Sequence, residues 1–213
     1  MSIEVKICGL RDAASVTAAV DTGAHYVGFV FHRSSTRFIA PEEARILAAL
    51  VPPSVMRTGL FVDVTDKELR EVLREVPLDL LQLHGNETPA RVKALRAMTG
   101  LPVMKALRIA TAEHLAPLAD FEAVADRLLF DTRIGEEPTG GTGKSFDWTL
   151  LKGHQITKPW MLAGGLKVSN LAEAVRITGA HIVDVSSGVE DAEGRKDPAK
   201  IREFIALASR LGN

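Results

Sequence analysis

Short apolar runs recur along the chain, and each is followed by a stretch with the polar and apolar spacing of a helix. Runs of this length, rich in Val, Ile, Leu and Phe, are typical of strands, and their alternation with helices predicts a parallel sheet covered by helices. Eight such runs occur: Glu4 to Cys8, Tyr26 to Phe31, Met56 to Val62, Leu78 to Leu83, Val103 to Arg108, Arg127 to Asp131, Trp160 to Ala163 and His181 to Ser186.

Capping residues mark where the intervening helices begin, and glycines mark where they end. Eight βα units in 213 residues predict an α/β protein with one small (β/α)8 TIM-barrel domain spanning residues 1–213. The alternative is an open, doubly wound sheet, but its dinucleotide-binding form expects a glycine-rich turn after the first strand, where this chain has Cys8-Gly9-Leu10-Arg11-Asp12. The expected starts are Thr65 with Glu68 as a capping box, Thr88 before Pro89, Ser169, and Asp197 before Pro198, and the expected stops are Gly23, Gly100 and Gly179.

Composition narrows the class of partner. The net charge is −1 and no block of like charge occurs, so we expect a small-molecule substrate and neither nucleic acid nor a membrane surface as partner. No apolar run approaches the roughly 18 residues of a membrane span. A single cysteine and the lack of a signal-peptide pattern favour the cytoplasm. The sequence leaves open whether the protein is a monomer or a homodimer.

That single cysteine, Cys8, ends the first predicted strand. Alternation places Lys6 and Cys8 on one side of this strand and turns Val5 and Ile7 to the other. A lone cysteine is more often inert and buried, but a lysine charge and the next helix N-terminus would favour the thiolate if this side faces the barrel interior. Cys8 is therefore a candidate base. For Lys6, pairing with Asp184 or another interior polar group is a slightly better explanation than direct tuning of the thiol.

Other polar residues also follow predicted strands, where a barrel places its active site. Asp131 ends the sixth run, and its carboxyl is a candidate general acid or else a loop or cap residue. His84 shares a strand side with Gln82, and we expect it to contact substrate. Arg37, in a polar connection after the second run, is a candidate for binding a carboxylate group. The six histidines contain no close pair at metal-ligand spacing, so we expect no metal.

Glycine-rich connections follow three of the last strands. The segment Thr139 to Ser145 does not match a nucleotide-binding phosphate loop, because Pro138 occupies the position of its first glycine. It remains a candidate anion-binding loop. Gly164 and Gly165 follow the seventh run, and Ser187 and Gly188 follow the eighth, where barrels of this class frequently bind phosphate. A phosphorylated ligand is therefore expected.

Taken together, these blocks resemble the phosphoribosylanthranilate isomerases, (β/α)8-barrel enzymes of tryptophan biosynthesis. One departure is Thr36, where family members often have proline. The resemblance covers nearly the whole chain and rests on Lys6-Ile7-Cys8-Gly9, Ser34 to Arg37, Gln82-Leu83-His84-Gly85, Phe130-Asp131, Gly140 to Gly143 with Phe146-Asp147-Trp148, Leu162 to Leu166, and Val183 to Glu190 before Gly194 to Asp197.

The resemblance implies an Amadori rearrangement of N-(5-phosphoribosyl)anthranilate without metal or organic cofactor. It makes Asp131 the general acid that protonates the furanose ring oxygen and Cys8 the general base that removes the C2′ proton. Arg37 is expected near the anthranilate end and His84 beside the aromatic ring. The further residues that it implies are Asp184 for a sugar hydroxyl, and Gly141, Gly143, Gly165, Ser187 and Gly188 for the phosphate.

Two other functions compete with this interpretation. A related phosphosugar barrel with lyase or synthase activity would need a catalytic lysine on an inner strand, and Lys105 on the fifth run is available. A ligand sensor without catalysis would keep the glycine loops and lack the acid or the base. The presence of both Cys8 and Asp131 at strand ends favours the isomerase over either alternative.

Overall fold

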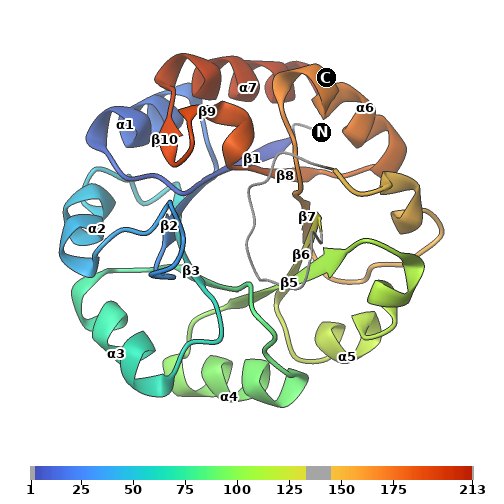
Figure 1. Cartoon of the computed structure of the whole chain (residues 1–213), viewed down its shortest axis with the longest axis horizontal. Coiled ribbons are helices and arrows are strands. Elements are labelled where there is room, and N and C mark those ends of the chain that lie inside the picture. The colour runs from blue at the N-terminus through green and yellow to red at the C-terminus, as the bar shows by residue number, and fades with distance from the viewer. Residues whose placement is uncertain (1–2, 133–144, 213) are drawn as a thin grey trace.

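Eight parallel strands close into a barrel in the computed structural model of the chain, which describes residues 3–132 and 145–212. Each strand pairs with the next along the chain, and β1 pairs with β8 to close the ring. Figure 1 looks down this barrel and shows the helices in a ring around it. The predicted (β/α)8 architecture is confirmed. The strands are β1 Glu4–Cys8, β2 Tyr26–Val30, β3 Met56–Phe61, β4 Leu80–Leu83, β5 Val103–Ile109, β6 Arg127–Thr132, β7 Trp160–Leu162 and β8 Ile182–Val185.

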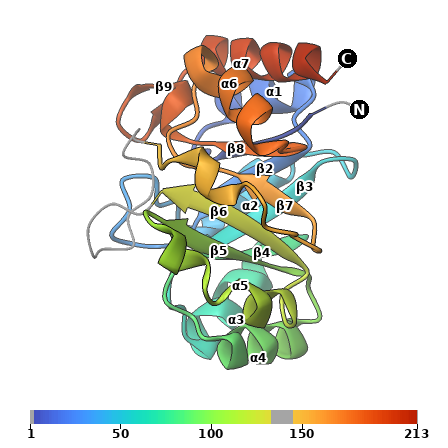
Figure 2. The same ribbon diagram turned by 90° about the vertical axis from the view of Figure 1, so that its right-hand side faces the viewer.

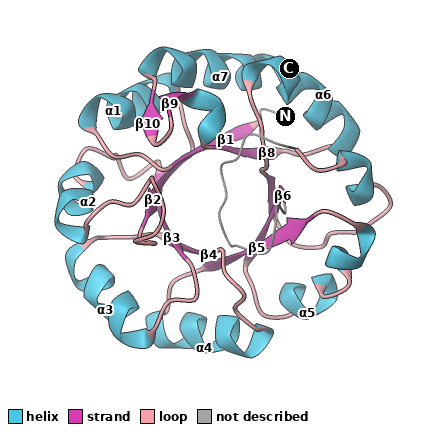
Figure 3. Cartoon of the chain, viewed as in Figure 1, coloured by secondary structure: helices cyan, strands magenta, loops and turns pink. Residues whose placement is uncertain are grey.

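Helices follow most of these strands (Figure 3). After β6, the described chain forms only a short 3₁₀ turn, Trp148–Leu151, in place of an α-helix. A small antiparallel hairpin of β9 Glu190–Ala192 and β10 Arg195–Lys196 precedes the last helix. The helices are α1 Ala13–Thr22, α2 Pro41–Ala48, α3 Asp66–Glu75, α4 Pro89–Thr99, α5 Leu118–Glu122, α6 Val168–Thr178 and α7 Pro198–Leu211.

Most of the expected helix boundaries are confirmed. Thr65 and Glu68 form a capping box at α3, Thr88 caps α4 and Asp197 caps α7. The stop glycines after α1, α4 and α6 all have left-handed backbone conformations. The expected start at Ser169 is wrong. Lys167 takes the N-cap position of α6, because its backbone N–H donates to Asn170 Oδ1 at 2.8 Å and Ser169 lies within the first turn.

The barrel has two apolar layers. The larger one lies between the strands and the helices, and it contains Val5 and Ile7, as the alternation in β1 predicts. A smaller cluster fills the barrel itself, and polar side chains stand beyond it at the strand ends, such as Asp131 two residues after Leu129. Figure 2 shows the loops that follow the strands at one end of the barrel, with β9 beside them, and both termini near the other end. Within the described residues no helix is long and apolar enough to span a membrane.

Candidate active site

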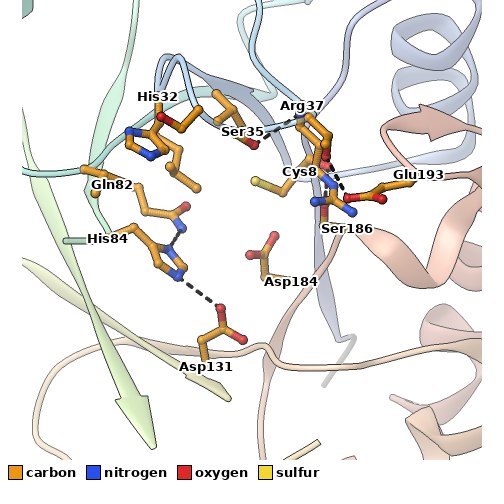
Figure 4. A pocket seen from close by; sticks show the side chains of 15 residues that line it. Cys8, His32, Ser35, Arg37, Gln82, His84, Asp131, Asp184, Ser186 and Glu193 are labelled. Carbon is orange, nitrogen blue, oxygen red and sulfur yellow. Dashed lines mark hydrogen bonds and ion pairs between the residues drawn. The ribbon is translucent and has the colours of Figure 1, made fainter. Parts of the chain in front are cut away.

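A cavity opens where the strands end, and five predicted site residues line it together. They are Cys8 on β1, Arg37 in the loop after β2, His84 directly after β4, Asp131 on β6 and Asp184 on β8. Figure 4 shows the side chains of Cys8, Asp131 and Asp184 pointing toward the same space. Residues separated by up to 176 positions are therefore neighbours, because every strand of a parallel barrel ends at the same mouth. The predicted phosphate residues Gly141 and Gly143 lie outside the described residues.

Cys8 is buried beside an ion pair. Lys6 Nζ lies 2.9 Å from Asp184 Oδ1, and the lysine side chain is fully buried. Lys6 thus has the predicted partner. Burial raises the pKa of the Cys8 thiol above its ordinary value, and although the charges of Lys6 and Lys196 oppose this rise, Asp184 adds to it. Lys6 therefore lowers the pKa of the thiol, but Asp184 offsets the lysine charge and burial outweighs it, so the net shift is upward.

Asp131 and His84 form a second pair on another wall of the cavity. Nε2 of His84 lies 3.0 Å from Asp131 Oδ2, and Nδ1 of His84 lies 2.9 Å from the Gln82 amide nitrogen (Figure 4). Because an amide nitrogen only donates, Nδ1 must accept and Nε2 carries the imidazole proton. The backbone N–H of Thr132 donates to the other Asp131 oxygen at 2.7 Å. The Asp131 carboxylate therefore accepts two hydrogen bonds and is held in one orientation.

Arg37 reaches the cavity with its guanidinium held by a carboxylate that the sequence did not single out. Its Nε and Nη2 donate to the two oxygens of Glu190 at 2.7 and 2.8 Å. Lys196 Nζ lies 2.6 Å from Glu190 Oε1 and also donates to the Ser186 hydroxyl and carbonyl. Arg37 and Lys196 lower the pKa of Glu190 although burial opposes them. A fixed, ionised Glu190 therefore holds the guanidinium of Arg37 in one orientation beside the cavity.

The hairpin and the loop after β2 are fastened to each other around this arginine. A Cβ at Gly194 would lie 2.6 Å from the Thr36 carbonyl oxygen, so only glycine allows this approach. The Thr36 hydroxyl donates to Glu193 at 3.2 Å, and the Gly194 N–H donates to Glu190 at 3.2 Å. Thr36 therefore replaces the proline expected at its position with a side chain that bonds to the hairpin.

The loops after β7 and β8 touch each other beside the cavity. A Cβ at Gly188 would lie 1.9 Å from the Leu166 carbonyl oxygen, so the two backbones are in direct contact. Gly165 adopts a φ of 65°, and Ser187 begins a 3₁₀ turn that ends at Val189. The neighbouring Ser186 lines the cavity. The predicted phosphate residues Gly165, Ser187 and Gly188 thus come together in space, next to the cavity rather than in its lining.

Lys105 faces away from this site. Its Nζ contacts Glu87 Oε2 at 2.7 Å and the Gly85 carbonyl at 2.8 Å, and it lies 5.7 Å from the ring centre of Phe121 in α5. The side chain is therefore on the helix side of β5, and the hypothesis that it is a catalytic lysine inside the barrel is wrong. Its role is to hold the β4–α4 connection that follows His84.

The described residues contain no group of three or more His, Cys, Asp and Glu side chains placed to bind a metal ion.

Some residues of the site were missed by the sequence analysis. Gly28 is one of them: it is paired with Cys8 across β1 and β2, and the alternation of inward and outward positions in β2 could have pointed to it. Glu190 could not be identified that way, because its partner Arg37 lies 153 positions away. Lys196 meets Glu190 through the fold of the β9–β10 hairpin, which alternation does not show.

Comparisons with known proteins agree on one family. The family model of N-(5'phosphoribosyl)anthranilate (PRA) isomerase matches residues 5–206. The N-(5'-phosphoribosyl)anthranilate isomerase of Paracoccus denitrificans is 55% identical over 211 residues, which are 98% of each chain. The solved phosphoribosyl anthranilate isomerase of Thermotoga maritima is similar with a TM-score of 0.86 and 34% identity, over 97% of this chain and 98% of that one. A phosphoribosyl anthranilate isomerase in complex with reduced 1-(o-carboxyphenylamino)-1-deoxyribulose 5-phosphate has a TM-score of 0.84 and 32% identity, over the same shares.

Proposed function

Because this chain belongs to the N-(5'-phosphoribosyl)anthranilate isomerase family, we propose that it converts N-(5-phosphoribosyl)anthranilate to 1-(2-carboxyphenylamino)-1-deoxyribulose 5-phosphate in tryptophan biosynthesis. One observation carries the proposal. A thiol and a carboxyl, Cys8 and Asp131, point into one cavity from different strands. The rearrangement needs an acid and a base acting on neighbouring substrate atoms, and this pair supplies both.

Asp131 acts as the general acid. Its proton passes to the furanose ring oxygen, the bond from that oxygen to C1′ breaks, and the anthranilate nitrogen forms a double bond to C1′. The product of this step is an open-chain iminium ion with Asp131 ionised. Negative charge develops on Asp131 during the transfer, and the donors at His84 Nε2 and Thr132 N are placed to stabilise it.

Cys8 acts as the general base. Its thiolate removes the proton from C2′, and the electrons of that C–H bond form the C1′–C2′ double bond of an enolamine, which neutralises the iminium nitrogen. Gain of a proton at C1′ and loss of one from the C2′ hydroxyl then give the ketone. Burial favours the neutral thiol in the free protein. Cys8 therefore releases its own proton to solvent before it acts as a base, and the positive charge of the iminium ion stabilises the thiolate that forms. Ring opening therefore precedes deprotonation.

The remaining residues bind the substrate. Arg37, held by Glu190, is oriented toward the anthranilate carboxylate, and His84 lies beside the aromatic ring. Asp184 accepts from a sugar hydroxyl with the oxygen that Lys6 does not occupy. Backbone N–H groups of Gly165, Ser187 and Gly188, with Gly141 and Gly143, hold the phosphate.

Both chemical steps are proton transfers, so we expect the reaction to need no metal or organic cofactor. Cys8 must remain a free thiol to act as a base, which favours the reducing cytoplasm as the place of reaction. The partner is a phosphoribosyl small molecule, and neither nucleic acid nor a membrane is involved. We expect a monomer or a homodimer, to be distinguished by light scattering at several protein concentrations.

The decisive experiment mixes the protein with freshly generated N-(5-phosphoribosyl)anthranilate and follows the loss of its fluorescence. We expect a rate far above the spontaneous background. Cys8→Ser and Asp131→Asn should each lower kcat by roughly 100-fold or more, because each removes one proton-transfer group. No acceleration by the unaltered protein would refute the assigned reaction, whereas near-normal turnover in one variant would refute only that residue's role.

A further inference from the structure

Gln82 is a polar side chain in the barrel interior whose position the reaction chemistry does not by itself explain. It is fully buried on β4, and its neighbours across the two adjacent strands are Leu60 and Met104. In the described part of the chain, its side chain makes one hydrogen bond, from Nε2 to His84 Nδ1 at 2.9 Å. Among residues 3–132 and 145–212, its buried carbonyl oxygen has no hydrogen-bond partner. A buried acceptor without a hydrogen bond is unfavourable, so Gln82 needs an explanation other than stability.

We propose that Gln82 is a positioning residue that fixes the tautomer of His84 and thereby the hydrogen bond to the general acid Asp131. The inference rests on the function proposed above for Asp131. The amide N–H occupies the Nδ1 lone pair, so the single proton of neutral His84 is on Nε2 and points at Asp131 Oδ2, 3.0 Å away. With the other tautomer, Nε2 would be an acceptor and would compete with the substrate for the proton of Asp131.

This tautomer of His84 sets the direction in which Asp131 transfers its proton. Asp131 can give its proton to the substrate and not to His84, and the carboxylate that remains accepts a hydrogen bond from Nε2. Figure 4 shows Gln82, His84 and Asp131 joined in this order by hydrogen bonds, with Gln82 on β4, His84 directly after it and Asp131 on β6. Gln82 also lines the cavity, and its contact with the general acid runs through the imidazole of His84.

Other titratable groups lie around the series of hydrogen bonds from Gln82 through His84 to Asp131, and they must stay unaltered in any test of it. Cys8, His32, Arg37, Asp184 and Glu193 line the same cavity. Arg108 on β5 is paired in register with Asp131, and its guanidinium donates to the Asn86 side chain at 2.7 Å. Lys105 and Glu87 are paired on the far side of β5.

The test begins with the unaltered protein. Histidine labelled with ¹⁵N, with the His84 signals assigned by their loss in His84→Asn, should show a neutral ring protonated at Nε2 alone. Gln82→Met keeps the length of the side chain but cannot donate, and Gln82→Glu accepts instead. We expect a mixture of tautomers in the first variant and protonation at Nδ1 in the second.

Turnover gives the second measurement. Gln82→Met should lower kcat by about 10- to 100-fold, the usual effect of removing a residue that orients a functional imidazole, with KM changed less than about threefold. Thr58→Val is the matched control, because Thr58 is also fully buried and its hydroxyl has no hydrogen-bond partner in the described structure. The control should keep normal kcat and the Nε2 signature.

An Nδ1 proton on His84 in the unaltered protein would overturn the inference without any variant. It would also fail if Gln82→Met kept normal turnover, or if Thr58→Val lost as much turnover with His84 unchanged. If Asp131→Asn is itself fully active, the proposed role of Asp131 fails. An inactive Asp131→Asn with a normal Gln82→Met would reject only the role of Gln82.

Discussion

Gly28 on β2 makes room for the Cys8 thiol, and the substitution Gly28→Ala tests how closely the base must be placed. The two residues are paired in register across β1 and β2. A Cβ on Gly28 would lie 2.9 Å from Cys8 Sγ, 3.1 Å from Cys8 Cα and 3.3 Å from Lys6 Nζ. Because all three atoms are closer than ordinary contact, the added methyl group must displace the thiol, the strand or both.

The size of the displacement sets the expected loss. Optimal contacts between heavy atoms begin near 3.5 Å, so Sγ must move by at least about 0.5 Å. The close contact with Cys8 Cα must also be relieved, and this moves the backbone that carries the thiol. A misplacement of about 1 Å can cost a reaction roughly 100-fold. We therefore expect Gly28→Ala to lower kcat by about 10- to 100-fold. Overpacking of this kind destabilises a protein by about 1–3 kcal/mol.

The assay is the fluorescence assay of turnover, corrected for folded protein by circular dichroism, with Gly59→Ala as the matched control. Gly59 lies on the neighbouring strand β3, and a Cβ there would lie 2.4 Å from Leu78 Cδ1 and 2.8 Å from Phe61 Cε2, both part of the layer between strands and helices. We expect this variant to lose thermal stability and keep its kcat. Equal losses of kcat in both variants, or normal turnover in Gly28→Ala, would refute the reasoning.

Three more predictions follow from the buried charges. Lys6→Met leaves the buried Asp184 carboxylate unpaired and should destabilise the protein by about 3–5 kcal/mol in urea titrations, with part of the loss recovered when Asp184→Asn is added. Because the pKa of Glu190 is lowered in the folded state, the stability it contributes is present above its unfolded value of about 4.3 and is lost as the pH falls through the folded value. Glu190→Gln should therefore flatten the decline of the melting temperature below about pH 5, and an unchanged slope would contradict this. Since burial raises the pKa of the Cys8 thiol above the ordinary 9.0, its alkylation by iodoacetamide should keep accelerating beyond pH 9, and a plateau below pH 8 would disprove it.

The sequence predicted the barrel because two signals mark each strand, an apolar run and a turn or capping signal beside it. The strand-end residues Cys8 and Asp131 could be placed at one mouth for the same reason, since parallel strands end together. These inferences depend only on local patterns and on the geometry common to all such barrels.

What the sequence could not predict depends on which face of a strand a residue occupies and on distant partners. In β5 apolar residues occupy both faces of the strand, so the sequence around Lys105 gave no sign that its side chain points to the helices. Glu190 lies 153 positions from Arg37, and no local pattern links them. The ionisation of Cys8 depends on the balance between burial and three nearby charges, which only coordinates can give.

The attachment of the loop after β2 to the β9–β10 hairpin has a practical consequence for protein engineering. The two segments share Glu190, which binds Arg37, and they meet at Gly194 and Thr36 without space for a larger side chain. A chimera that receives only one of the two segments from a distant homologue would lack the matching contacts on the other segment. To redesign which carboxylate-bearing substrates enter the barrel, both segments should be transplanted together as one cassette.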